Sequence, residues 1–535
     1  MYSRGTGRRP VFKRRGLWYN GGMRHLLPIA AILVLLPVAR AADPPSLKAV
    51  EEQMQKVIDD VTPAVVAVVV SHAEYPPEPG VKRGPGRLGG YEPQNQPDNR
   101  RFGPRWPGRP QPPLDRLDLS RPENTADHLF GSGVVLDPQA GLVLVPYHLT
   151  DGATKVYVRA STGEGSYADI FAADSKSDLA VIKLLSPPAG LKAVRFADVR
   201  LADTPDGKKA TVRRGSWVIA VGHPLAAGAG DGSPSASWGI VSNTNRASAP
   251  PPVQPEPTAQ KPLHAYGGLI QVDARVTLGS SGTGVFDPDG RLVGLGSAVA
   301  AVYGSEASGG YAVPLDRNYR KIIDSLKAGR EVEYGFLGIE PASHPDGIGV
   351  IAKSITPTCA AAAAGLYPED VITAIDGHPL RKDGDLLLRV GAALAGTEVT
   401  LEFRRDGGQP RTAKAVLAKN NNPLPFLATV PPPSVHGLTV EYQSTKFGGA
   451  GGRMARTPPN PPPGVVIREL ERGSAADKKF QDLGPSRGWW VITHVDGKPV
   501  TTPAEFHAAV KGKASVKLLL ADSDDPANRQ TITLP

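Results

Sequence analysis

The chain has 535 residues, 40% of them hydrophobic and 21% charged, so it has room for about three or four domains and cannot be wholly disordered. A single cysteine, Cys359, excludes a disulfide scaffold and a cysteine-based zinc site within one chain. The formal net charge of +9, taken by itself, would suit nucleic acid or an acidic surface as a partner.

The first 41 residues are predicted to be a secretory signal peptide. A basic region without acidic residues precedes the apolar run Leu26–Val38, and Ala39–Ala41 has the small-x-small pattern of a cleavage site. The run is short for a bilayer and contains two prolines, so we expect no stable membrane span once the leader is removed. An uncleaved anchor is the alternative, and both Met1 and Met23 are candidate starts.

The positive charge is concentrated in this leader. It holds eight Lys and Arg, which leaves 53 basic against 52 acidic residues and a net charge of +1 for the remainder. The sequence therefore predicts export to the periplasm or another part of the cell envelope, and no nucleic-acid partner. The alternative hypothesis is that the basic segment 80–110 binds DNA, which would make binding strongly salt-dependent.

The region after the leader is predicted to be mostly β. Apolar residues at helical spacing predict a helix over 47–61, and the β-branched run 64–70 predicts a buried strand. Residues 73–127 are rich in Pro, Gly and Arg and predict a long loop. Short apolar runs punctuated by Gly, Pro, Asp and Asn then predict a sandwich or barrel over 129–300, followed by one helix over 318–326.

The C-terminal part contains a duplicated module. The pattern Val-Ile-Thr-x-[Ile/Val]-Asp-Gly-x-Pro-[Leu/Val] occurs at residues 371–380 and again at 491–500. It predicts a strand, a tight Asp-Gly turn and a second short strand. In both copies a helical segment and a further strand follow.

Three residues of the β region are candidates for nucleophilic catalysis. His148 follows an apolar strand, Asp178 begins another, and Ser281 lies in a glycine-rich loop. A serine hydroxyl needs an imidazole to accept its proton and a carboxylate to orient that imidazole. The order His, Asp, Ser matches a known triad order, and the amides of Gly279 and Ser281 would form an oxyanion hole. Each motif alone is weak, because an isolated His or Asp at a strand end is more often structural.

Several motifs resemble the HtrA/DegP family of envelope serine proteases. They occur in the family's order and approximate spacing, and are Gly131–Val135, Ser177–Ile182, Val221–Pro224, Ile270–Ala274 and Gly310–Pro314. The resemblance implies a mostly β fold, with a trypsin-like double β-barrel at 42–330, a PDZ domain at 335–420, a linker at 421–432 and a PDZ-like domain at 433–535. It implies that His148 is the general base, Asp178 the orienting acid and Ser281 the nucleophile. The 73–127 loop lies at the position where the family has a long regulatory loop.

The PDZ resemblance implies a peptide-binding loop in the first module, formed by Phe336, Leu337, Gly338 and Ile339. Its amides would hold a peptide C-terminus while the peptide adds to the sheet edge. The second module has Gly437–Val440 in the comparable place, without a central glycine, so its peptide binding stays open. Residues 294–299 match the specificity-pocket segment and imply small or aliphatic side chains at the cleavage site.

The resemblance as a whole implies an exported, ATP-independent serine endopeptidase that cleaves unfolded or damaged envelope proteins. It implies no cofactor and no metal, unfolded polypeptides and peptide C-termini as partners, and a homotrimer or larger oligomer. Pro146 beside the base and Thr283 beside the nucleophile depart from the family pattern. The alternative is therefore a catalytically inactive chaperone or peptide-binding scaffold.

Overall fold

The computed structural model describes residues 47–72, 118–121, 129–201, 210–224, 232–247, 262–276, 279–297, 310–421, 424–447, 460–483 and 486–535. The predicted signal peptide lies outside these described residues. The same holds for the predicted loop 73–127, apart from residues 118–121. Among the helices of the described residues, none is long and apolar enough to cross a bilayer.

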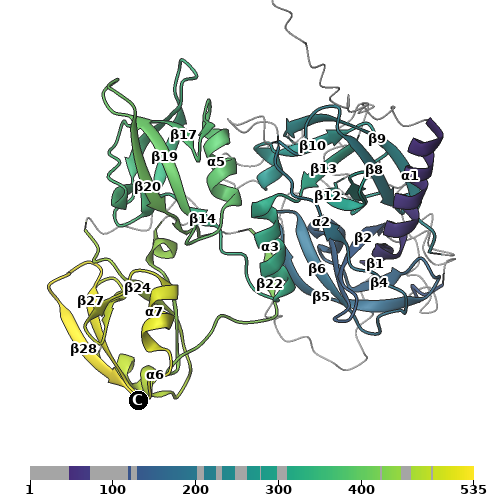
Figure 1. The fold of residues 1–535 in the computed structure, drawn as a ribbon. Coiled ribbons are helices and arrows are strands. Elements are labelled where there is room, and N and C mark those ends of the chain that lie inside the picture. Colours follow the sequence, from purple (N-terminus) through teal and green to yellow (C-terminus); the bar gives the residue numbers. More distant parts are fainter. Residues whose placement is uncertain are drawn as a thin grey trace, which may run out of the picture. The chain divides into compact units, whose positions relative to one another are not determined.

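The first sheet closes into a six-stranded barrel, in the order β5-β4-β1-β2-β3-β6, because β5 also pairs with β6 (Figure 1). Runs of Val, Ile and Leu that are buried along much of each strand favour such a closed sheet, which leaves no free edge. Every residue of β1 is buried. The strands are β1 Val65–Ser71, β2 Leu129–Asp137, β3 Leu142–Pro146, β4 Lys155–Arg159, β5 Gly165–Asp174 and β6 Leu179–Leu184.

The second sheet closes in the same way, in the order β11-β8-β9-β10-β13-β12, with a pairing between β11 and β12. A short strand, β7 Arg195–Phe196, pairs in parallel with β12. The barrel strands are β8 Trp217–Gly222, β9 Ser235–Arg246, β10 Leu269–Val272, β11 Gly284–Phe286, β12 Arg291–Gly296 and β13 Gly310–Pro314. The two barrels confirm the predicted mostly β, trypsin-like fold.

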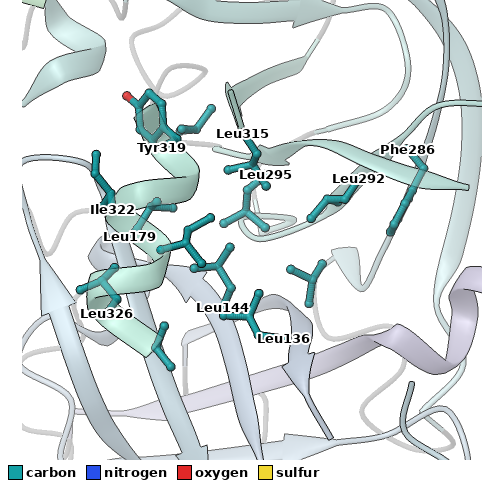
Figure 2. Close-up of a cluster of buried hydrophobic side chains, with 14 of the residues drawn as sticks. Leu136, Leu144, Leu179, Phe286, Leu292, Leu295, Leu315, Tyr319, Ile322 and Leu326 are labelled. Carbon is teal, nitrogen blue, oxygen red and sulfur yellow. The ribbon is translucent and has the colours of Figure 1, made fainter. Parts of the chain in front are cut away.

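A single apolar cluster joins both barrels and the helix α3 Arg317–Lys327 (Figure 2). Asp316 caps α3 by accepting hydrogen bonds from the backbone N–H groups of Asn318 and Tyr319, at 2.9 and 3.0 Å. Four side chains of α3 are buried, and each such burial contributes roughly 1.5–3 kcal/mol. The helix α1 Leu47–Val61 buries Met54, Val57 and Val61. Both helices were predicted from their spacing.

The duplicated modules have the same sheet topology. In the first, the strand order is β15-β16-β17-β19-β20, and in the second it is β23-β24-β25-β27-β28. The first contains β15 Ile339–Ser343, β16 Val350–Ile355, α4 Ala360–Ala363, β17 Val371–Ile375, β18 His378–Pro379, α5 Asp383–Ala392, β19 Glu398–Arg404 and β20 Arg411–Val416. The second contains β23 Leu438–Tyr442, η8 Gln443–Lys446, β24 Val465–Leu470, α6 Ala475–Asp482, β25 Trp490–Val495, β26 Lys498–Pro499, α7 Pro503–Val510, β27 Val516–Asp522 and β28 Arg529–Leu534.

Part of the expected linker 421–432 is itself a strand. Residues Phe426–Ala428 form β22, which pairs antiparallel with Ala172–Asp174 of β5. Here β5 has passed the end of its pairing with β4, so its outer edge accepts another strand. A second short pair joins β14 Gly335–Phe336 to β21 Ala418–Lys419. The sequence predicted only a proline-rich linker here. The strand β22 could not be recognised, because its three residues show no alternation of apolar and polar side chains.

Candidate active site

His148 lies on α2 Tyr147–Thr150, a single helical turn that directly follows β3. Pro146 occupies the N-cap position with an extended backbone, which ends the strand and begins the turn. Pro146, which departs from the family pattern, has no backbone N–H to donate at this point. The N–H groups of the next two residues are nevertheless satisfied. Tyr147 N–H donates to the carbonyl of Asp178 at 3.0 Å, and His148 N–H donates to Asp178 Oδ1 at 3.0 Å.

Asp178 ends the turn between β5 and β6 and has a left-handed backbone, with φ of +59°. Its side chain is only 5% exposed. Burial is the largest single influence and favours the neutral form of this carboxyl. The charge and hydrogen bonds of His148, together with the charge of His264, outweigh burial and hold the pKa of Asp178 below its ordinary value. The carboxylate is therefore ionised at neutral pH.

Ser281 lies in a tight loop between Gly279 and Gly282, both of which have positive φ. The backbone of this loop is tied to β2, because Ser132 N–H donates to the Ser281 carbonyl at 2.7 Å. Thr283, the departure from the family pattern, is buried and donates its hydroxyl to the carbonyl of Ser280 at 2.7 Å. The threonine thus closes the loop rather than displacing Ser281.

The structure brings the three predicted residues together. His148 Nδ1 lies 2.8 Å from Asp178 Oδ1 and 2.9 Å from Oδ2, and His148 Nε2 lies 2.9 Å from Ser281 Oγ. With Nδ1–H donating to Asp178, Nε2 is left as the acceptor for the serine proton. This is the geometry in which an imidazole activates a hydroxyl for attack on a carbonyl carbon.

Two further residues near the triad escaped the sequence analysis. Ser297 places its hydroxyl 3.4 Å from Asp178 Oδ2. His264 lies close enough to Asp178 and His148 to interact with their charges, and burial lowers the pKa of His264. Ser297 falls in the segment assigned to the specificity pocket, but no local motif indicates its contact with an aspartate 119 residues away.

The predicted peptide-binding loop of the first module lines a cavity of about 220 Å³. Phe336, Leu337, Gly338 and Ile339 line it together with Leu386, Leu387 and Val390 of α5. The carbonyls of Leu337 and Gly338 accept hydrogen bonds from Ala361 N–H and Thr356 N–H, both at 2.8 Å, which fixes the loop. The cavity therefore lies between this loop and α5, and Lys176, Leu263 and Tyr266 of the preceding region also line it.

Comparisons with known proteins agree with this architecture. A family model for a trypsin-like peptidase domain matches residues 131–295, and one for a PDZ domain matches residues 335–415. The periplasmic serine endoprotease DegP of Escherichia coli is 26% identical over 401 residues, covering 73% of this chain and 73% of its own length. A probable DegP-like periplasmic endoprotease of Brucella suis is 26% identical over 497 residues, covering 87% of each chain.

A probable periplasmic serine protease of Haemophilus influenzae is 26% identical over 341 residues, which cover 62% of this chain and 66% of that relative. Among solved structures, an HtrA-type protease, AlgW, bound to a tripeptide matches with a TM-score of 0.44 and 20% identity, over 69% of this chain and 98% of that one.

Proposed function

We propose that this chain cleaves unfolded or damaged proteins of the cell envelope through an acyl-enzyme. The chain is a serine-type endopeptidase, and its similarity to periplasmic endoproteases supports assignment to the HtrA family. The observation that carries the proposal is the unbroken hydrogen-bonded series from Asp178 through His148 to Ser281 Oγ. Its relatives are described as periplasmic proteases, which supports an exported location.

In the proposed reaction, Ser281 Oγ attacks the scissile carbonyl carbon while His148 Nε2 accepts the hydroxyl proton. Asp178 stabilises the imidazolium that forms and keeps Nδ1 protonated. The amides of Gly279 and Ser281 are the proposed donors to the oxyanion. His148 then gives its proton to the leaving amine, and a water molecule, deprotonated in the same way, hydrolyses the acyl-enzyme.

The first PDZ module is proposed to bind substrate or regulatory peptides by their C-termini, with Phe336–Ile339 as the carboxylate loop. The second module is proposed to be a further PDZ domain, on the strength of its identical strand order. Gly294 and Gly296 lie in the segment assigned to the specificity pocket. Because they are small, they support a preference for a small or aliphatic substrate side chain immediately before the cleaved bond. The family resemblance supports a homotrimer or a larger oligomer.

The proposal is tested by labelling the full chain with a fluorophosphonate probe and comparing it with Ser281→Ala. We expect covalent labelling and casein cleavage by the wild type, with both lost in the variant, because cleavage without the nucleophile falls by at least about 10⁴-fold. A wild type that neither labels nor cleaves casein would leave the scaffold hypothesis as the better one.

A further inference from the structure

The turn that presents Asp178 is held by a second aspartate. A non-glycine residue with left-handed φ costs about 1 kcal/mol or more, so the surrounding structure must stabilise Asp178 in that conformation. Asp174, at the end of β5, is 1% exposed. Its Oδ2 accepts hydrogen bonds from Ser177 N–H at 2.8 Å and from Ser177 Oγ at 2.6 Å. These two bonds fix the residue immediately before Asp178.

A tyrosine from a distant part of the chain completes this arrangement. Tyr334 lies between α3 and β14, is fully buried in the same apolar cluster as α3, and donates its hydroxyl to Asp174 Oδ2. Lys176 Nζ lies 4.1 Å from the centre of the Tyr334 ring. Burial raises the pKa of Tyr334 well above its ordinary value, so the hydroxyl stays protonated and can only act as a donor toward a carboxylate.

Two other segments contact the same turn through backbone atoms. Ser175 donates from its N–H and its Oγ to the carbonyl of Pro425, at 3.2 and 2.7 Å, just before β22. Leu263 N–H donates to the carbonyl of Lys176 at 2.8 Å. Segments well separated in sequence thus converge on residues 174–177. Of these segments, the one that contains Tyr334 contacts Asp174 through a side-chain hydroxyl.

We propose that Tyr334 and Asp174 are positioning residues, which hold the 174–177 turn so that the Asp178 carboxylate stays aligned with His148. The alignment is sensitive to small movements, because Asp178 Oδ1 serves both the backbone N–H and Nδ1 of His148, at 3.0 and 2.8 Å. This inference rests on the triad proposed above. It adds to that triad two residues that touch neither the substrate nor the reacting atoms.

The test is Tyr334→Phe in the full chain, which removes one oxygen and keeps the ring on Lys176. We expect kcat toward a chromogenic peptide to fall by roughly tenfold to a hundredfold with little change in KM, because misplacing a group that acts in the transition state affects the chemical step.

Tyr319→Phe is the matched control. Tyr319 is another buried tyrosine of the same cluster, and among the described residues its hydroxyl has no hydrogen-bond partner. We expect this variant to keep the kcat and the KM of the wild type. If Tyr334→Phe only lowers the melting temperature and has the same kcat as Tyr319→Phe, the residue has a purely structural role and the inference is wrong.

A second readout does not require proteolysis. The proton shared by His148 Nδ1 and Asp178 should give a low-field proton resonance, which Tyr334→Phe should shift or broaden while Tyr319→Phe leaves it in place. This separates the two proposals. A chain that is not labelled at Ser281 but shows this difference contradicts the proposed function and supports the positioning role. A resonance unchanged in Tyr334→Phe contradicts the positioning role.

Discussion

The two C-terminal modules share a strand order but differ in how they present the edge strand of the sheet. In the first module, β15 is the edge strand, and all of its residues are half-buried or exposed. In the second module the equivalent strand is β23, and all five of its residues are buried. The proposed peptide would join the sheet along this edge, which is accessible in the first module and covered in the second.

The proposed carboxylate loop does not distinguish the modules. Gly338 has φ of +84° and Gly437 has φ of +79°. A Cβ at Gly338 would lie 2.3 Å from Cys359 Cβ, and a Cβ at Gly437 would lie 2.3 Å from Ser474 Cβ. The expectation that the second module lacks the central glycine is therefore wrong. Gly437 is the equivalent of Gly338, two positions earlier than an alignment of Gly437–Val440 with Phe336–Ile339 would place the central residue.

A buried charged cluster lies at the covered strand. Lys419, at the end of β21, places Nζ 2.6 Å from Glu441 of β23, 2.8 Å from Glu331 and 3.1 Å from Glu333. The carbonyl of Lys419 also accepts a hydrogen bond from Ser444 Oγ at 2.6 Å. This cluster ties β23 to the end of the first module and accounts for the burial of a charged residue, Glu441, on an edge strand.

Removing this lysine should have the largest effect on the comparison. We expect Lys419→Met to lower the free energy of unfolding by about 1–3 kcal/mol, because it removes the closest cation from the buried Glu441 carboxylate and leaves it only Arg468 Nη1, at 3.1 Å. Deuterium exchange in β23 should rise. Burial alone would lower the pKa of Lys419, but the three carboxylates outweigh it and raise that pKa above 10.5. The stabilisation is therefore fully present below pH 10.5 and is lost as the pH rises through the higher folded value.

Lys414→Met is the matched control for this variant. Lys414 also forms an ion pair, with Glu398 at 2.7 Å, but both side chains are more than half exposed. Such a surface pair contributes little, so its loss should leave urea unfolding unchanged. Equal unfolding free energies for the two variants would show that the cluster does not stabilise β23.

Much of this architecture could be predicted from the sequence. The duplicated Asp-Gly turns were predicted, and Asp376 and Asp496 do have the positive φ that such hairpins require. The triad was predicted from the order His, Asp, Ser and from the family resemblance, because each of the three motifs is weak by itself. The contact of Tyr334 with Asp174 and the burial of β23 could not be predicted, because both depend on residues far apart in the chain, for which a single sequence carries no local pattern.

Alanine at the two equivalent glycines should separate stability from binding. Gly338→Ala and Gly437→Ala should each destabilise their own module by roughly 1–3 kcal/mol, because both force a side chain into a left-handed backbone and a close contact. Only Gly338→Ala should also abolish binding of a fluorescent peptide with a free hydrophobic C-terminus, measured by anisotropy at a temperature where calorimetry shows both variants folded.

An amidated version of the peptide serves as the control for recognition of the carboxylate, and we expect it to bind neither variant nor the wild type. Loss of binding in Gly437→Ala to the same extent as in Gly338→Ala would contradict the comparison, since it would mean that the covered β23 edge also takes peptide.

The smallest expected effect concerns how the equivalent helices α5 and α7 begin. In both, a carboxylate of the first turn reaches back: Asp385 accepts from Lys382 N–H at 3.2 Å, and Glu505 accepts from Thr502 N–H at 3.2 Å. Only α7 has the reciprocal bond, in which Thr502 Oγ1 accepts from Glu505 N–H at 3.2 Å, because lysine at the N-cap of α5 has no oxygen to offer.

Thr502→Ala should therefore cost about 1 kcal/mol of unfolding free energy in the second module, because it leaves one N–H of the first turn without its partner. Lys382→Ala should leave the first module within the error of a urea titration, because the exchange deletes no capping bond. A loss from Lys382→Ala as large as that from Thr502→Ala would mean that the lysine stabilises α5 through its aliphatic stem. The two helices would then begin with equal stability by different means, and the modules would differ only at their edge strands.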